Sequence, residues 1–155
     1  MKTIVSKSNL STQEKQFVFQ LWNDEYPAKI CYQSVSEFDT YLDNLSDVTH
    51  YLLFDEFDII QGWAITFTRE KETWFAIIIN SKIQNKGFGT HLLQHLKSIE
   101  SSISGWVIDH NNDLKLNGTT YVSPLQFYVK NGFSICNEIR IESEKITAVK
   151  IVWNL

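Results

Sequence analysis

The sequence has few of the residues that crosslink or interrupt a chain: two cysteines, two prolines and six glycines among 155 residues. Cys31 and Cys136 lie far apart and lack the spacing of a zinc or redox motif, so we expect two buried free thiols and no metal. No apolar run reaches the roughly 18 residues of a membrane span, and the N-terminal segment lacks the apolar core of a signal peptide. These absences predict a soluble, cytoplasmic protein with no membrane partner.

Positive charge is also scarce. Lysine and arginine together number 14 against 18 aspartates and glutamates, which gives a formal net charge of -4. Binding to nucleic-acid phosphates needs clustered basic residues, and the sequence has no such cluster, so no nucleic-acid partner is expected. Hydrophobic residues make up 43% and aromatic residues 14%, enough for one sizeable core. Because no linker or repeat divides the chain, we expect a single domain over residues 1–155.

Capping signals predict the first two helices. Ser11 and Glu14 have the spacing of a capping box, and the helix that they begin should end at Tyr26, before Pro27. Ser36 is the expected start of a second helix, which carries apolar residues at helical spacing over residues 38–45.

Strands are predicted where β-branched and aromatic residues gather. The run at 73–79 is continuously apolar, which is typical of a central strand covered on both faces. The second strand of an expected hairpin alternates, as a strand with one inward face should. The predicted strands cover residues 49–54, 59–68, 73–79, 105–109, 133–139 and 147–153, with further helices after residue 90 and over 125–130. The order of elements predicts an α/β (α+β) fold with a partly antiparallel sheet.

A glycine-containing segment joins the central strand to the next helix. Gln84, Gly87 and Gly89 form a Q-x-x-G-x-G pattern at the helix N-terminus, where backbone N–H groups lack intrahelical partners. Glycine lets an anion approach these groups closely, so the pattern favours a phosphate or pyrophosphate ligand. A tight turn without a ligand is the alternative. The pattern has neither the Walker GK[ST] ending nor the third glycine of a dinucleotide-binding loop.

The strand, the Q-x-x-G-x-G pattern and the amphipathic helix resemble motif A of the GNAT superfamily of acyl-CoA-dependent N-acyltransferases. Residues 124–133, with Tyr128 followed by Gly132 and Phe133, are similar to the late motif of that family. The resemblance covers nearly the whole chain. It implies a mixed, mostly antiparallel central sheet flanked by helices, with splayed central strands, and acetyl-CoA as cosubstrate.

The resemblance also implies where coenzyme A binds. The last residues of the central strand would offer backbone groups to the pantetheine arm, and the strand at 105–109 would splay to admit the thioester. The expected pantetheine contacts are Ile77, Ile78 and Ile79, and the residues expected around the phosphates are Gln84, Asn85, Lys86, Gly87, Phe88, Gly89 and Thr90.

Three residues are candidates for catalysis. Tyr128 occupies the position of the tyrosine that often protonates the leaving thiolate in this family; its alternative is a core aromatic. Glu72 is nearest to the place of the glutamate base, or is a solvated turn residue paired with Lys71 or Arg69. His110 follows the splayed strand and is of a residue type suited to act as a base, or is an ordinary loop residue.

The acceptor is less defined. Where the family has an asparagine that contacts the cofactor, this sequence has Tyr121, with Asn117 upstream in an unusually long loop. Both could line an acceptor pocket or pack on the surface. Aromatic residues near the first helices, Trp22, Tyr26 and Tyr32, could shape such a pocket, form a dimer contact or belong to the core. The acceptor is expected to be a small-molecule or peptide amine, and a homodimer stays open.

The resemblance thus predicts an N-acetyltransferase that acts by direct attack of the amine in a ternary complex. No cysteine lies near the inferred site in the sequence, which disfavours an acyl-enzyme. The alternatives are a catalytically inactive CoA-binding regulatory or interaction module, for which the absence of a clear base argues, and transfer of a longer acyl chain.

Overall fold

The computed structural model describes residues 3–155. Its helices are α1 (Thr12–Glu25), α2 (Val35–Asp43), α3 (Phe88–Ile99) and α4 (Leu125–Lys130), with short 3-10 turns η1 (Ala28–Ile30) and η2 (Ser81–Ile83). Its strands are β1 (Thr3–Lys7), β2 (Ser46–Phe54), β3 (Ile60–Arg69), β4 (Glu72–Ile79), β5 (Ser102–Val107), β6 (Ser134–Glu142) and β7 (Thr147–Asn154).

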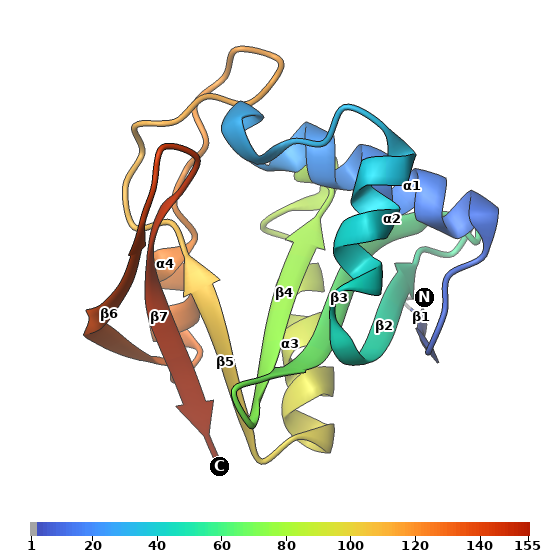
Figure 1. Cartoon of the computed structure of the whole chain (residues 1–155). Helices are drawn as coiled ribbons and strands as arrows, with labels where there is room; N and C mark the ends of the chain where they lie inside the picture. The colour runs from blue at the N-terminus through green and yellow to red at the C-terminus, as the bar shows by residue number, and fades with distance from the viewer. Residues whose placement is uncertain (1–2) are drawn as a thin grey trace.

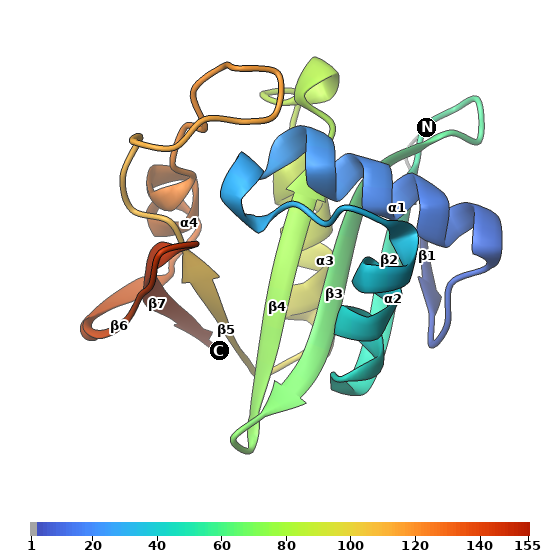
Figure 2. The same cartoon turned by 45° about the horizontal axis from the view of Figure 1, so that its top comes forward.

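The strands form a seven-stranded sheet in the order β1-β2-β3-β4-β5-β7-β6. Neighbouring strands are antiparallel except β4 and β5, which are parallel. Helices α1 and α2 cover one face of the sheet, and α3 and α4 cover the other (Figures 1 and 2). The predicted mixed, mostly antiparallel sheet flanked by helices is confirmed.

Two hydrophobic cores lie on the two faces. One is built on α3 and α4, with Leu93 and Tyr128 among its members, and the other on α1 and α2, with Val18 and Phe38. Strand β3 contributes to both, so it is covered on two sides rather than on one as its alternating pattern predicted.

The parallel strands β4 and β5 meet at one end only. Their single register pair joins Trp74 to Ser104, and beyond it the strands diverge toward their C-terminal ends (Figure 1). A Cβ atom on Gly105 would lie 2.9 Å from the Phe75 ring, so the absent side chain lets that ring lie against β5 at the base of the wedge. The predicted splay of the central strands is therefore present.

Local signals explain the helix starts. The Ser11 side chain accepts a hydrogen bond from the Glu14 amide, and Glu14 accepts one from the Ser11 amide, as the capping box predicted. Helix α2 begins at Val35, earlier than predicted, because its N-cap is Ser34 rather than Ser36. The Ser34 side chain accepts a hydrogen bond from the Glu37 amide.

The strand bounds differ from the prediction by up to three residues in β2, β5 and β6, and one strand was missed. Strand β1 was not predicted, and it pairs with β2 at the sheet edge. Strand β5 ends at Val107 rather than at residue 109, because Asp109 leaves the sheet to pair with Arg140.

Cys31 and Cys136 are free, as expected, but half-buried rather than buried. Among residues 3–155, no helix is long and apolar enough to cross a membrane.

Candidate functional site

The segment at 84–90, called the glycine loop here, leads from β4 into α3. Gly87 has a φ of 82° and directly precedes the helix, and Asn85 has a φ of 66°. Gly87 provides no side chain to cap the first amides of α3. The left-handed conformation at Gly87 explains why a glycine stands there, because a Cβ atom is strained in this region.

Five amides of the glycine loop lack acceptors among the described residues. In the described chain, no hydrogen bond is formed by the N–H groups of Asn85, Lys86, Gly87, Gly89 or Thr90. The first intrahelical bond runs from the His91 amide to the Gly87 carbonyl. The phosphate prediction depends on free amides and on the positive end of the α3 dipole, and both features are present in this segment.

Two contacts hold the glycine loop against its neighbours. The Gln84 side chain donates to the carbonyl of Ile79 at 3.0 Å, so it closes the loop on the end of β4. A Cβ atom on Gly89 would lie 3.3 Å from the Phe127 ring. Gly89 therefore also allows α3 to approach α4, which agrees with the interpretation of the glycines as a tight turn.

A cavity of about 330 Å³ lies beside the wedge between β4 and β5. We call it the aromatic cavity, because eight aromatic side chains from α1, α2, the segment between them and the sheet dominate its walls together with Tyr121 and Tyr128. Its lining residues are Trp22, Tyr26, Ile30, Tyr32, Tyr41, Phe67, Arg69, Trp74, Phe75, Ala76, Ile77, Trp106, Val107, Ile108, Tyr121, Pro124, Tyr128 and Ile146.

The aromatic cavity reaches both faces of the sheet. Tyr128 and Ile77 belong to the core beneath α3 and α4, whereas Trp22 and Trp106 belong to the core beneath α1 and α2. Ile77 is only half-buried although it lies in a continuously apolar strand, because it faces this space. Such a passage can bring together two substrates that enter from opposite faces.

The described lining of the aromatic cavity is almost free of charged groups. Arg69 is the one charged side chain among the described lining residues, which include no carboxylate and no imidazole. Trp74 is 3% exposed, and its Nε1 is a buried donor without an acceptor in the described chain.

Tyr128 lies in the aromatic cavity, 7% exposed, and Phe75 and Phe133 contact its ring edge-on. Burial raises the pKa of Tyr128 well above the ordinary value for tyrosine. Its hydroxyl is therefore protonated at neutral pH, as a proton donor must be.

Glu72 lies at the closed end of the wedge and outside the cavity lining. Both of its carboxylate oxygens accept hydrogen bonds from Lys150 Nζ, at 2.9 and 3.1 Å. The alternative of a paired residue thus agrees with the structure, except that its partner is Lys150 and neither Lys71 nor Arg69.

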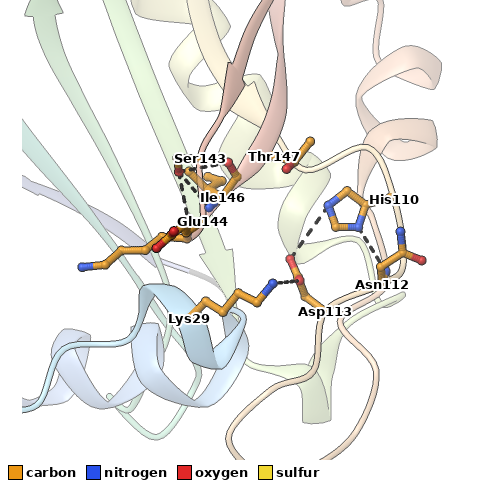
Figure 3. A pocket seen from close by; sticks show the side chains of 9 residues that line it. Lys29, His110, Asn112, Asp113, Ser143, Glu144, Ile146 and Thr147 are labelled. Atoms are coloured by element: carbon orange, nitrogen blue, oxygen red, sulfur yellow. Dashed lines mark hydrogen bonds and ion pairs between the residues drawn. The ribbon is translucent and has the colours of Figure 1, made fainter.

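His110 lines a different pocket, of about 280 Å³, near the β6–β7 turn (Figure 3). Its Nδ1 accepts from the Asn112 amide at 3.1 Å, and its Nε2 lies 3.9 Å from Asp113, which also pairs with Lys29. Ile146 lines both pockets, so they adjoin. Among residues 3–155, no group of three or more His, Cys, Asp or Glu side chains could hold a metal ion.

The long loop after β5 is fixed in place over the wedge. Lys115 forms an ion pair with Glu25 at the end of α1, and the Ala28 amide donates to the Leu114 carbonyl. Tyr121 lines the aromatic cavity, as one alternative predicted, and burial raises its pKa to about 12. Asn117 instead accepts hydrogen bonds from Thr119 within the loop.

The cavity contains residues that sequence reasoning found and others that it missed. Trp22, Tyr26 and Tyr32 line it, and they also belong to the core beneath α1 and α2 or pack against it, as the core alternative predicted. Arg69 and Trp74 were not predicted as site residues. Their place at the β3–β4 hairpin was the only indication of this role. The register there pairs Arg69 with Glu72 and Phe67 with Trp74, at the base of the wedge.

The architecture is a mixed α/β fold with a wedge between two parallel strands. Similar solved structures include an acyl-CoA N-acyltransferase from Pseudomonas aeruginosa (TM-score 0.70, 15% identity, covering 98% of this chain and 99% of that one). Another is a GNAT-superfamily phosphinothricin acetyltransferase from Sinorhizobium meliloti in complex with acetyl-CoA (TM-score 0.69, 10% identity, covering 99% of this chain and 89% of that one). A third is a spermidine N-acetyltransferase from Vibrio cholerae (TM-score 0.68, 17% identity, covering 99% of this chain and 93% of that one).

No protein-family profile matches the chain, and no curated protein matches it in sequence. The solved structures nevertheless agree over nearly the whole chain. The chain has the GNAT fold, and the fold predicted from the glycine loop and the late motif is confirmed.

Proposed function

We propose that this protein is an N-acetyltransferase that transfers the acetyl group of acetyl-CoA to an amine acceptor by direct attack in a ternary complex. The observation that carries the proposal is the set of loop amides without acceptors at the mouth of a wedge that opens into the aromatic cavity. The GNAT fold adds support, because the similar structures include enzymes named for acetyl transfer to phosphinothricin and to spermidine.

In the proposed complex, the amides of the glycine loop bind the pyrophosphate of coenzyme A. The edge of β4 beyond Trp74 has no register partner on β5, so its backbone groups at Ile77 to Ile79 can bond the pantetheine arm. A backbone N–H of this edge can also stabilise the charge that develops on the thioester oxygen. The thioester then reaches the cavity that Tyr128 lines.

The transfer replaces the C–S bond of the thioester with a C–N bond to the acceptor. The amine nitrogen donates its lone pair to the carbonyl carbon, a C–N bond forms, and the C–S bond breaks with its electron pair on sulfur. The nitrogen releases one proton to water, and sulfur takes one from Tyr128, which recovers a proton from solvent. An apolar cavity beside Arg69 lowers the pKa of a bound amine, so loss of its proton needs no carboxylate in the lining.

Calorimetry with coenzyme A tests the loop. Gly89→Glu adds a negative charge to the first turn of α3, with its Cβ atom 3.3 Å from the Phe127 ring, and we expect it to weaken coenzyme A binding by about a hundredfold or more through charge repulsion. Gln94→Glu adds the same charge on an exposed position of α3 and is the matched control. Unchanged affinity in a folded Gly89→Glu protein would refute the assignment.

An inactive CoA-binding module is the second candidate, because no carboxylate or imidazole is among the described lining residues of the aromatic cavity. Thiol release from acetyl-CoA in the presence of a broad amine panel separates the two. Coenzyme A binding without turnover of any amine supports the module. Comparison of acetyl-CoA with longer acyl-CoA substrates tests the chain length in the same assay.

A further inference from the structure

Arg69 lies on the aromatic wall without a partner charge. Its guanidinium carbon is 4.9 Å from the Phe67 ring centre and 5.2 Å from the Trp74 ring centre. No carboxylate pairs with it in the described chain, whereas nearby Lys150, 5.2 Å from the same Trp74 ring, is neutralised by Glu72 at 2.9 Å. A cation in an aromatic cavity is thus left available for an anion that comes from outside the chain.

Trp74 supports Arg69 through its ring. The Arg69 guanidinium lies over the Trp74 ring, so the cation is held against an aromatic face. The Nε1–H of Trp74 has no acceptor in the described chain, but this atom has almost no accessible surface, so it is not offered to a ligand.

The same lining disfavours a cationic acceptor. Aromatic cages can bind ammonium groups, but Phe67 and Trp74 already carry the Arg69 guanidinium. Like charges repel strongly where water is excluded, and the described lining holds no carboxylate to compensate a second cation. A polyamine therefore matches this cavity poorly, whereas a ring-sized apolar group matches the remaining walls, including Trp22 and Trp106.

The register of β4 sets the spacing of the two ends of the acceptor. Trp74 and Ala76 point to the same face, and their separation along the strand is about 7 Å. Ile77, next along the strand, lies where the pantetheine arm is proposed to run. The reacting nitrogen should therefore lie about one ring length from Arg69.

We infer, on the basis of the proposed function, that the acceptor is an amine joined through an apolar, ring-sized body to a carboxylate, and that Arg69 binds this carboxylate. The amine end faces the thioester, and the aromatic walls enclose the body between them. This assigns a specificity role to a residue outside the glycine loop and away from Tyr128.

Thiol release with three probes tests the substrate class. The probes are 4-(aminomethyl)benzoate, benzylamine, which lacks only the carboxylate, and spermidine. We expect kcat/KM for the benzoate to exceed that for benzylamine by about tenfold or more, as a charge-assisted bidentate contact allows. A preference for benzylamine or spermidine would overturn the inference.

Two variants test the role of Arg69. Arg69→Gln should reduce the ratio of kcat/KM for the benzoate to that for benzylamine by about tenfold or more. Lys71→Gln removes a charge from the same β3–β4 turn, outside the cavity lining, and should leave the ratio unchanged. An unchanged ratio in Arg69→Gln would also overturn the inference.

Calorimetric titration of 4-(aminomethyl)benzoate into the protein with coenzyme A bound separates this inference from the proposed function. Binding that weakens in Arg69→Gln, without turnover of any amine, contradicts the transferase proposal and supports the carboxylate site. Turnover of other amines, with no detectable binding of the benzoate, supports the transferase and contradicts the carboxylate site.

Discussion

The carboxylate of Glu25 lies 3.2 Å from the ammonium group of Lys115, although 90 residues separate them in the sequence. Glu25 is 8% exposed and also accepts a hydrogen bond from the Ser81 amide at 2.8 Å. One side chain at the end of α1 thus joins the segment after β4 to the long loop after β5. These two segments flank the open end of the wedge, so the contact fixes the walls between which the cosubstrate is proposed to enter.

Removing Lys115 should destabilise the protein. Lys115→Met leaves the Glu25 carboxylate buried with one fewer partner, and we expect a loss of about 3 kcal/mol in the free energy of unfolding. Urea denaturation measures this loss. Chymotrypsin should also cleave faster near Leu114 and Tyr121, because the loop loses its anchor.

The matched control is the exposed pair between Lys15 and Asp39. Asp39→Asn should change the free energy of unfolding by no more than about 1 kcal/mol, because water screens that pair. Equal effects of the two substitutions would show that the buried Glu25–Lys115 pair stabilises the protein no more than the Lys15–Asp39 pair does.

Tyr128→Phe tests the proposed proton donor. Phenylalanine fills the same buried space, so the protein should fold and bind coenzyme A with little change. Loss of the hydroxyl should lower kcat by about a hundredfold, since protonation of the leaving thiolate then depends on water. Single-turnover measurements of thiol release should show the loss in the chemical step; an unaltered rate would assign Tyr128 to packing alone.

Glu72 and His110 can be tested as bases in one experiment. Glu72→Gln removes the charge that neutralises Lys150, and His110→Gln removes an imidazole that lines the neighbouring pocket. Because neither side chain lines the aromatic cavity, we expect kcat to fall by no more than about threefold in either variant. A loss above about a hundredfold, with a shifted acidic limb in the pH–rate profile, would restore that residue as the base.

His50 should make stability depend on pH. It is 4% exposed, its Nδ1 accepts from Trp63 Nε1 at 3.1 Å, and burial lowers its pKa to about 4. The unfolded chain binds a proton on His50 near pH 6.5, whereas the folded chain does not, so stability is lost as pH falls from about 6.5 toward 4.

Urea denaturation of wild type and His50→Gln at about pH 7.5 and about pH 5 measures this effect. Glutamine can still accept from Trp63 but does not titrate. We expect the wild type to lose stability relative to the variant by on the order of 1 to 2 kcal/mol across this range. A constant difference between the two proteins would mean that His50 titrates normally in the folded state.

The fold could be predicted largely because its signals are local. The capping residues of α1, the apolar run of β4 and the glycine loop each depend on a few consecutive residues. Strand β1 lacked such a signal: it is a short edge strand in which Ile4 packs on the core while Val5 is exposed. For α2, Ser34 and Glu37 formed the better capping pair, and the competing serine at position 36 hid it.

The site could be predicted only where it follows from a motif. The glycine loop and Tyr128 belong to recognisable patterns, and both lie where the resemblance implied, at the wedge and in the cavity. Arg69 and Trp106 line the same cavity but come from strands far apart in the sequence, and their proximity depends on the sheet register. No spacing rule contains that information, so the character of the cavity required the structure.

Because β4 and β5 share a single register pair, the sheet consists of two halves, β1–β4 and β5–β7–β6. Side chains mainly hold these halves together. Backbone amides on the facing edges beyond Trp74 lack the protection of a ladder. They should exchange with deuterium faster than those between β2 and β3. A molecule that fills the wedge can supply hydrogen-bond partners to these amides, and it should slow hydrogen exchange on β4 and β5 together.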